Sequence, residues 1–187
     1  MKVAVIDHYD SFTFNLVQAV GEHTSDLKVY LCDQVPSDDL EAFQPTHLIF
    51  SPGPGMPKNT GQSPSILKTW IGKIPILGVC LGYQLIATHY GYSLIRSPKI
   101  FHGKTSQIEH TQSGLFQGIS SPTLVMRYHS WIVDGNATLG LQFTAHTKDF
   151  IPMAFEDPQN KIYGVQFHPE SILTNDGKKM IKNFLWM

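Results

Sequence analysis

Four short, mostly apolar runs, separated by segments that suit helices, constrain the fold of this chain more than any other feature. The runs are residues 3–7, 27–31, 47–51 and 74–79. Each has the length and composition of a buried parallel strand. Helices are expected at 12–22, from 37 onward, at 63–71 and directly after the fourth run. Strands that alternate with helices in this way form right-handed crossovers and a parallel sheet.

After about residue 91 the pattern changes to short runs typical of antiparallel or mixed strands. The expected strands are residues 105–109, 123–128, 139–145, 153–156 and 162–165. Turn sequences at 134–136 and 157–160 separate some of them, and residues 176–187 suit a closing helix. We therefore predict an α/β fold with an open, mostly parallel central sheet flanked by helices, and extra antiparallel or mixed strands in the C-terminal half. Because no repeat, low-complexity tract or linker interrupts the chain, we expect residues 1–187 to form a single domain.

The composition indicates a globular protein and favours neither a nucleic-acid nor a membrane partner. Of the 187 residues, 42% are hydrophobic and 16% are charged, with 14 Lys and Arg against 15 Asp and Glu. No apolar run approaches the roughly 20 residues of a membrane span, and the N-terminus does not resemble a signal peptide. The two cysteines, Cys32 and Cys80, do not make a disulfide framework. We expect a cytoplasmic protein, since reducing conditions suit a free catalytic thiol.

Cys80 lies where the fourth strand is expected to turn into a helix, within the sequence Gly-Val-Cys-Leu-Gly at residues 78–82. This Gly-x-Cys-x-Gly pattern is the thiol counterpart of a nucleophile elbow, in which flanking glycines allow a tight turn and leave the nucleophile exposed. A helix N-terminus also favours the thiolate, which is the reactive form of cysteine. Cys80 is therefore the candidate nucleophile, whereas Cys32 is expected to be a small buried residue.

His168 is the strongest candidate, among nine histidines, for the base that a cysteine nucleophile needs. It follows the expected strand 162–165, and ligands of open α/β sheets bind at strand ends. Residues two apart in an extended segment point to the same side, so Glu170 is predicted to orient the His168 ring. His102 and His129 lack such a carboxylate, and the remaining histidines are expected to be surface or packing residues.

A loop rich in proline and glycine, Ser-Pro-Gly-Pro-Gly-Met-Pro at residues 51–57, follows the expected third strand. Glycines let backbone N–H groups approach a ligand closely. The N–H groups of Gly55 and Leu81 are therefore predicted to form an oxyanion hole, and a rigid connector is the alternative role for the loop. The sequence lacks the nucleotide-binding glycine pattern, a phosphate-loop ending and zinc-like Cys/His spacing, so no cofactor and no metal are expected.

Three of these motifs together resemble the class I, triad-type glutamine amidotransferases. They are Ser-Pro-Gly-Pro-Gly at 51–55, Gly-Val-Cys-Leu-Gly-Tyr-Gln at 78–84 and Phe-His-Pro-Glu-Ser at 167–171. More narrowly, the chain is similar to the glutaminase subunit of anthranilate synthase and aminodeoxychorismate synthase. The features of that narrower group are residues 6–15, 102–106, 127–130 and 170–174. The resemblance covers essentially the whole chain.

The resemblance implies an activity and a role for each matched residue. Cys80 would attack the side-chain amide of L-glutamine, His168 would move the proton, and Glu170 would orient His168. A glutamyl thioester would form and water would release glutamate, while the ammonia would pass to a chorismate-using synthase subunit. The residues implied to bind glutamine are Gly53, Pro54, Gly55, Gln84, Ser130 and Trp131, the last two through their backbone.

The chain departs from the usual pattern of this family at two positions. Tyr83 stands where histidine is usual, on the expected helix after the nucleophile, and the change is expected to be tolerated because the position is outside the triad. Trp131 stands where leucine is usual. If Trp131 acts through its backbone, glutamine binding survives; if its side chain shapes the pocket, the affinity differs.

Several alternatives stay open at this point. The chain could be the amidotransferase part of guanylate or carbamoyl phosphate synthesis, or a non-catalytic binding subunit of the same fold. Nothing in the residues separates the tryptophan pathway from the folate pathway. Residues 10–11 are either a helix cap or part of a partner interface, and residues 102–106 are either a strand entry or an interface element. The resemblance implies low glutaminase activity for the isolated chain, because a partner completes such sites.

Overall fold

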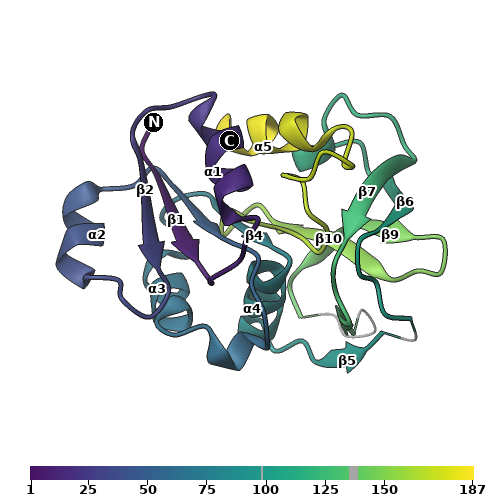
Figure 1. Ribbon diagram of the computed structural model, residues 1–187, viewed down its shortest axis with the longest axis horizontal. Helices are drawn as coiled ribbons and strands as arrows, with labels where there is room; N and C mark the ends of the chain where they lie inside the picture. The colour runs from purple at the N-terminus through teal and green to yellow at the C-terminus, as the bar shows by residue number, and fades with distance from the viewer. Residues whose placement is uncertain (98, 135–138) are drawn as a thin grey trace.

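The computed structural model describes residues 1–97, 99–134 and 139–187, and these form a nine-stranded mixed sheet with helices on both faces (Figure 1). The strands of this sheet lie in the order β2-β1-β3-β4-β11-β10-β9-β6-β7. A separate two-stranded sheet pairs β5 with β8. The predicted α/β fold, with a parallel core flanked by helices and antiparallel strands added in the C-terminal half, is confirmed.

Five strands form the parallel part of the sheet. They are β1 (Val3–Asp7), β2 (Leu27–Leu31), β3 (His47–Phe50), β4 (Ile76–Val79) and β11 (Ile162–Val165). β1 pairs with β2 and β3, β3 pairs with β4, and β4 pairs with β11, all in parallel. Because these strands run in the same direction, their carboxyl ends share one edge of the sheet. That edge therefore brings the residues after β1, β3, β4 and β11 together.

Two layers of helices cover the parallel strands. The helices are α1 (Thr13–Gly21), α2 (Ser37–Phe43), α3 (Ser63–Trp70), α4 (Leu81–His89) and α5 (Gly177–Leu185). Alternate side chains of β1 enter two cores: Val3 and Val5 pack with α1 and α5, while Ala4 and Ile6 pack with α2, α3 and α4. Burial on both faces explains why these strands are apolar throughout, and each fully buried Val or Ile stabilises the fold by about 1.5–3 kcal/mol.

The remaining strands are antiparallel to their neighbours. They are β10 (Pro152–Asp157), β9 (Gln142–Thr147), β6 (Lys104–His110) and β7 (Thr123–Arg127) in the large sheet, and β5 (Leu94–Arg96) and β8 (Trp131–Val133) in the small one. β10 pairs with β11 and β9, and β6 pairs with β9 and β7. Two single turns of 3₁₀ helix, Pro57–Asn59 and Gly114–Phe116, complete the described elements.

Some predicted boundaries in the C-terminal half are wrong. The strand expected at 139–145 begins at Gln142, because Leu139 and Gly140 form a bend in which Gly140 has a φ of +100°. β5 and β8 were not predicted, since three residues are too few for a periodic signal. Of the turn expected at residues 134–136, residues 135 and 136 lie outside the part of the chain that the structure describes.

Neither Asp10 nor Ser11 is the N-cap of α1, so the helix-cap alternative for residues 10–11 is wrong. The N-cap is Phe12, and no side chain caps it. The Asp10 carboxylate instead accepts the N–H of Phe12 at 2.7 Å, just before the helix begins. The Thr13 hydroxyl donates to the Asp7 carboxylate at 2.7 Å, which ties the start of α1 to the end of β1.

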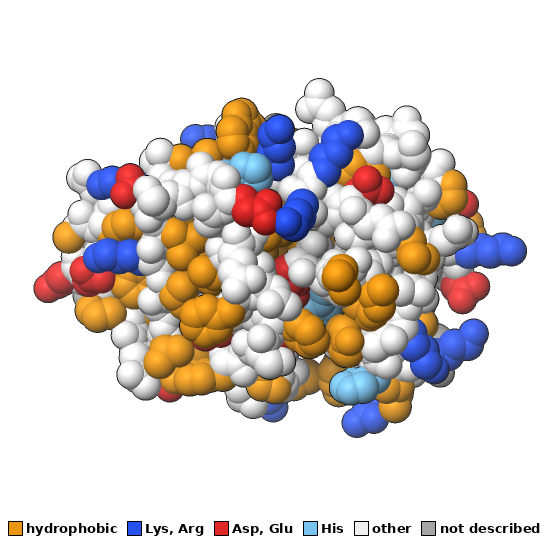
Figure 2. Space-filling model, turned by 45° about the horizontal axis from the view of Figure 1, so that its top comes forward, with side chains coloured by type: hydrophobic (Ala, Val, Ile, Leu, Met, Phe, Trp, Pro, Cys, Tyr) orange, Lys and Arg blue, Asp and Glu red, His pale blue; other side chains and the backbone are white. Residues whose placement is uncertain are grey.

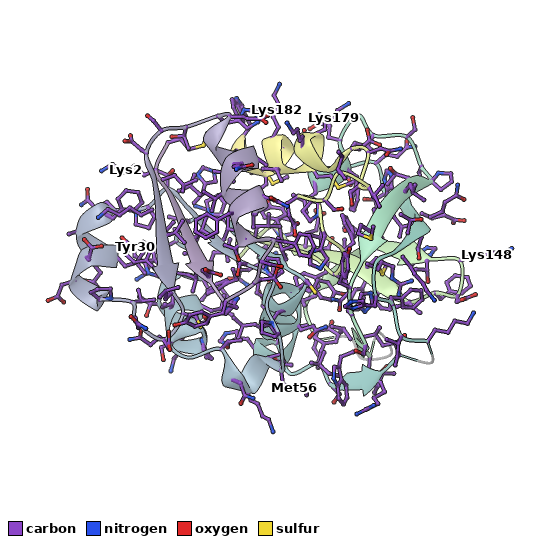
Figure 3. All side chains as sticks on the ribbon, viewed as in Figure 1. Lys2, Tyr30, Met56, Lys148, Lys179 and Lys182 are labelled. Atoms are coloured by element: carbon purple, nitrogen blue, oxygen red, sulfur yellow. The ribbon has the colours of Figure 1, made fainter. Side chains whose placement is uncertain are left out.

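Side chains fill the space between the sheet and the helices on both sides (Figure 3). On the face shown in Figure 2, charged side chains of both signs are scattered among hydrophobic ones, and no region of a single charge dominates. Four large hydrophobic side chains in the segments that follow β1 and β11 are exposed: Tyr9, Phe14, Ile172 and Leu173. Within the described ranges, no helix has both the length and the apolar character needed to cross a membrane.

Candidate active site

Cys80 lies at a strained turn between β4 and α4. Its φ of 52° and ψ of −97° fall in a region that non-glycine residues rarely adopt. The turn is held at both ends by backbone hydrogen bonds: the Cys80 N–H donates to Val165 O at 2.9 Å, and the Cys80 carbonyl accepts the N–H of Gln84 at 3.1 Å. The backbone of β11 therefore fixes the position of the candidate nucleophile.

The two glycines of the elbow serve close packing, and the strained conformation belongs to Cys80 itself. A Cβ on Gly78 would lie 2.5 Å from the carbonyl oxygen of Gly82. A Cβ on Gly82 would lie 2.3 Å from the carbonyl oxygen of Phe50, at the end of β3. Neither glycine has a positive φ, whereas Cys80 does. The Gly-x-Cys-x-Gly pattern thus allows β3, β4 and α4 to approach closely around the cysteine.

His168 and Glu170 meet, but the chain between them turns and does not extend as predicted. The Ser171 N–H donates to His168 O at 3.2 Å, which closes a tight turn with Pro169 at its second position, where proline is favoured. Within this turn Nδ1 of His168 lies 2.6 Å from Oε1 of Glu170. The Glu170 side chain is fully buried and the His168 side chain is 3% exposed, so the pair is screened from solvent.

The backbone of His168 is anchored to its surroundings by two contacts, which a third contact between the same neighbours supports. Its N–H donates to Met126 O at 3.0 Å, at the end of β7, and its carbonyl accepts the Thr174 hydroxyl at 2.6 Å. The same hydroxyl accepts the Met126 N–H at 3.0 Å. A Cβ on Gly177 would overlap the carbonyl of Pro169, so the turn also packs directly on the start of α5.

The electrostatics of the site favour a charged His168. Burial opposes protonation of the ring, but the nearby Cys80 thiolate and the Glu170 carboxylate together raise the pKa of His168 well above its ordinary value. Nε2 of His168 is buried and makes no hydrogen bond of normal geometry among the described residues, although the effect of Cys80 on the His168 pKa shows that the two side chains are close. The rings of Phe12 and Tyr128 stand edge-on to the imidazole, with centroids at 5.8 and 5.4 Å.

The loop after β3 lies against the N-terminus of α4. A Cβ on Gly53 would come within 2.8 Å of the Leu81 side chain and 2.4 Å of the His8 Cβ. His8 holds the start of this loop, since Nδ1 donates to Ser51 O at 2.9 Å and Nε2 accepts the Ser63 hydroxyl at 2.9 Å. Burial lowers the pKa of His8, which keeps its ring neutral for these two contacts.

The two groups predicted to form an oxyanion hole are both available as donors. Gly55 has a φ of +89° and is exposed, and Leu81 is the first residue of α4. Helix N-termini leave their first N–H groups without partners in the helix. Across the residues that the structure describes, neither the N–H of Gly55 nor that of Leu81 makes a hydrogen bond.

The residues implied to bind glutamine are only partly brought together. The Gln84 amide donates to the Trp131 carbonyl at 3.2 Å, so α4 and the start of β8 are linked beside Cys80. The Ser130 carbonyl accepts the N–H of Ser97 at 2.9 Å, and the Trp131 indole packs against the Arg96 guanidinium at 5.3 Å. Gly53, Pro54 and Gly55 lie in the loop after β3, and no hydrogen bond links this loop to Gln84, Ser130 or Trp131 among the described residues.

Tyr83, the other departure from the usual pattern, points into the core and not toward the site. It is fully buried and stacks on Phe155 with a centroid distance of 4.4 Å. Its side chain belongs to the core between the sheet and α2, α3 and α4, whereas Cys80 lies in the core on the other face.

Gln166 was given no role from the sequence, and Arg127 and His129 were identified only through the motif at 127–130 and, for His129, as a weaker candidate base. The Gln166 amide lies 3.8 Å from Cys80 Sγ, and buried Arg127 bonds to buried His129 at 3.0 Å. A signal existed for Gln166, which precedes His168 by the same spacing of two that led to Glu170. Within residues 1–97, 99–134 and 139–187, no group of three or more His, Cys, Asp or Glu side chains could hold a metal ion.

A cysteine on a strained strand–helix turn, beside a buried histidine–carboxylate pair at the carboxyl edge of a parallel sheet, defines a class of enzyme: cysteine-dependent acyl transfer on an α/β scaffold. Comparison with known proteins gives the family. The chain belongs to the class I glutamine amidotransferases, whose family model matches residues 4–187. The resemblance inferred from the sequence motifs is therefore confirmed.

Sequence similarity to individual relatives extends over nearly the whole chain. The chain is 46% identical over 185 residues to aminodeoxychorismate/anthranilate synthase component 2 of Bacillus subtilis, covering 98% of this chain and 95% of that protein. It is 44% identical over 188 residues to the bifunctional protein TrpGD of Thermotoga maritima, covering 98% of this chain but 32% of that longer protein. A solved protein of Thermoplasma acidophilum, described as part of a GMP synthase, shares the fold with a TM-score of 0.87 at 24% identity, covering 100% of this chain and 92% of that one.

Proposed function

We propose that this chain is the glutaminase subunit of a chorismate-using synthase, which hydrolyses L-glutamine through a thioester on Cys80 and delivers ammonia to the synthase subunit. The observation that carries the proposal is the position of Cys80 beside His168, whose other ring nitrogen binds Glu170 at 2.6 Å. Relatives named as component 2 of anthranilate and aminodeoxychorismate synthases support the choice of partner. Residues 1–187 act as one domain in this proposal, since the large sheet takes strands from both halves of the chain.

The reaction would begin from a thiolate and a protonated His168, because the pKa of His168 is raised by its two anionic neighbours. The Cys80 sulfur attacks the side-chain carbonyl carbon of glutamine, and the carbonyl electron pair moves to oxygen. The N–H groups of Gly55 and Leu81 would bind that oxyanion, and each such donor is typically worth about 3 kcal/mol in the transition state.

The second half of the reaction returns the site to its starting state. His168 gives its Nε2 proton to the leaving nitrogen, so that the C–N bond breaks and ammonia and a glutamyl thioester form. His168, now neutral, takes a proton from water, and the resulting hydroxide attacks the thioester. The C–S bond breaks, glutamate leaves, and the thiolate and the protonated ring are restored.

The experiment that tests this function separates ammonia production from its use. In the complex with the synthase subunit, Cys80→Ser should abolish glutamine-dependent synthesis and leave ammonia-dependent synthesis intact. Cys32→Ala is the control, because Cys32 is buried in the core that does not contain Cys80, and it should keep both activities. Loss of both activities in Cys80→Ser, or glutamine-dependent synthesis at the normal rate, would contradict the assigned role.

The partner is tested by reconstitution. The purified chain is mixed with the synthase subunit of an anthranilate synthase, of an aminodeoxychorismate synthase, and of a guanylate or carbamoyl phosphate synthase, and glutamine-dependent product is measured. We expect product with one or both of the chorismate-using subunits only. The isolated chain is expected to hydrolyse glutamine slowly, since Cys80 is only 6% exposed and the oxyanion donors come partly from a surface loop.

A further inference from the structure

Arg127 is a buried guanidinium that the proposed reaction does not use. It is 1% exposed, its Nε donates to Nε2 of His129 at 3.0 Å, and its Nη1 donates to Ser106 Oγ at 3.1 Å. The guanidinium lies 3.4 Å from the centre of the Phe101 ring. Within the described part of the chain, no carboxylate forms an ion pair with it. A buried charge without a carboxylate partner is costly, so its contacts are candidates for a functional role.

The contact with Arg127 determines where His129 carries its proton. Arginine can only donate hydrogen bonds, so Nε2 of His129 must accept, and the ring proton must be on Nδ1. That Nδ1–H donates to the carbonyl oxygen of Trp131 at 3.0 Å. Burial and the charge of Arg127 lower the pKa of His129 to about 3, which keeps the ring neutral and in this single tautomer.

The Trp131 carbonyl also determines the direction of the hydrogen bonds that lead through Gln84 and Gln166 to Cys80. The Trp131 carbonyl can only accept, so Gln84 must present its amide NH₂ to it, at 3.2 Å. That NH₂ also donates to Oε1 of Gln166 at 3.1 Å. Gln166 must therefore turn its own NH₂ toward Cys80 Sγ, which is 3.8 Å away. The orientation of each amide group follows from the group before it, so only one assignment of donors and acceptors fits all of these hydrogen bonds.

We propose that Gln166 is a further catalytic residue, which stabilises the anionic form of the Cys80 sulfur. Arg127 and His129 are positioning residues, which fix the Trp131 carbonyl at the start of the hydrogen bonds that lead through Gln84 to Gln166. The inference rests on the proposed function only for the role of Cys80 as nucleophile. A hydrogen bond from an N–H group is stronger when the acceptor is an anion than when the acceptor is neutral. Gln166 thus stabilises the thiolate before attack and again when the C–S bond of the thioester breaks.

The role of Gln166 is tested by alkylation of Cys80 with iodoacetamide in the isolated chain, measured from pH 5 to 10. Apart from His168 itself, the titratable or charged groups beside the sulfur or next to that ring are Glu170, on the same turn after β11, and His129 with its partner Arg127, at the end of β7. In Gln166→Leu we expect the midpoint of the rate profile to rise by about one pH unit, so that the rate at low pH falls about tenfold, with the plateau at high pH unchanged.

A second variant of Gln166 and a control variant elsewhere on the chain complete the alkylation test. Gln166→Glu retains the size of the side chain but presents a carboxylate oxygen to the sulfur, so its midpoint should rise at least as far. Gln159→Leu makes the same change as Gln166→Leu at an exposed turn between β10 and β11, and should alkylate like the wild type. If both Gln166 variants are folded by circular dichroism and alkylate at the wild-type rate at every pH, the role of Gln166 is overturned.

The positioning role is tested by the tautomer of His129, observed by ¹⁵N NMR of the imidazole rings. We expect the Nδ1–H form in the wild type and a mixture of both tautomers in Arg127→Met, which removes the donor and keeps an apolar contact with Phe101. Lys148→Met, which removes an exposed cation, should leave the tautomer unchanged. An Nε2–H ring in the wild type, or a pure Nδ1–H ring in Arg127→Met, would overturn the role of Arg127.

Both measurements use the chain alone, without glutamine or a synthase. If glutamine-dependent synthesis is absent while the alkylation and tautomer results are as expected, the proposed function fails and this inference stands. If synthesis is present while Gln166 and Arg127 variants behave like the wild type, only this inference fails.

Discussion

The parallel and antiparallel halves of the molecule build the site by different means. The parallel half holds Cys80 by backbone packing, because Gly78 and Gly82 bring β3, β4 and α4 too close together for any added atom. The antiparallel half contributes Arg127, His129 and the Trp131 carbonyl, which are joined by side-chain hydrogen bonds. His168 lies where the two halves meet, after β11 and against the end of β7.

This difference indicates how each half should respond to substitution. Close-packed backbone cannot relax around an extra methyl group, so substitutions in the parallel half are expected either to reduce stability severely or to have almost no effect. A hydrogen-bonded arrangement loses one contact at a time, so changes in the antiparallel half are expected to have graded effects. Four substitutions test this contrast.

The largest effect is expected for Gly82→Ala. The new Cβ would lie 2.3 Å from the backbone oxygen of Phe50, which cannot move without displacing β3. We expect the free energy of unfolding in urea to fall by about 3 kcal/mol or more, with loss of glutamine-dependent activity. Gly21→Ala is the control, since nothing lies within 4 Å of the new Cβ at the end of α1, and it should be neutral or slightly stabilising. Equal stability of the two variants would contradict the packing argument.

Glu170→Gln should have the next largest effect, on activity and not on folding. The amide keeps the shape of the carboxylate but removes the charge that helps to raise the pKa of His168. We expect glutamine-dependent synthesis to fall about 100-fold, while ammonia-dependent synthesis is unchanged. Because the pKa of His168 falls in the variant, the alkaline limb of the activity profile should move to lower pH. A rate of glutamine-dependent synthesis within threefold of the wild type, with an unshifted pH profile, would show that Glu170 does not raise the pKa of His168.

Acid should destabilise the antiparallel half through His129. Burial and Arg127 lower its pKa to about 3 in the folded protein, against about 6.5 in the unfolded chain. The unfolded state therefore binds the extra proton below pH 6.5, and this contribution to stability is lost as the pH falls from 6.5 toward 3. The slope is about 1.4 kcal/mol per pH unit, or roughly 2 kcal/mol between pH 6.5 and 5.

The variant that isolates this contribution is His129→Gln, which has no titrating ring. His8, His47 and His110 also have lowered pKa values and remain in the variant, so the change in slope between pH 6.5 and 5 reports His129 alone. Urea unfolding at several pH values measures it. An unchanged slope would mean that His129 is as easily protonated in the folded chain as in the unfolded one.

The smallest effect is expected for Thr174→Val, at the junction of the two halves. The variant keeps the shape of the side chain but loses the hydroxyl that donates to His168 O at 2.6 Å and accepts from the Met126 N–H. We expect a loss of about 1–2 kcal/mol in the free energy of unfolding. Thr69→Val, whose exposed hydroxyl donates to the Ser65 carbonyl within α3, should lose less than about 0.5 kcal/mol. A reversed order would contradict the role of Thr174 in holding the His168 turn.

The sequence predicted the parallel half well, because short apolar runs separated by helices allow few arrangements. The edge at which Cys80, the loop after β3 and the end of β11 meet follows from the parallel direction of the strands. The contact between His168 and Glu170 was predicted from an extended segment, yet it arises in a turn closed by Ser171. Spacing alone therefore identified the pair without giving its geometry.

The antiparallel half was less predictable, for two physical reasons. β5 and β8 have three residues each, and the start of β9 depends on a bend at Gly140, so periodicity carries little information there. Arg127 and His129 belong to residue types that are rarely fully buried, and only the fold buries them. Gln166 could have been found, since it shares the spacing of His168 and Glu170.

Covalent trapping with a glutamine-analogue electrophile, followed by mass spectrometry of the digested chain, tests directly whether Cys80 is the nucleophile when the synthase subunit is present. We expect one adduct, on the peptide that contains Cys80, and none on the peptide that contains Cys32. No adduct at Cys80, or equal labelling of Cys32, would contradict the role of Cys80.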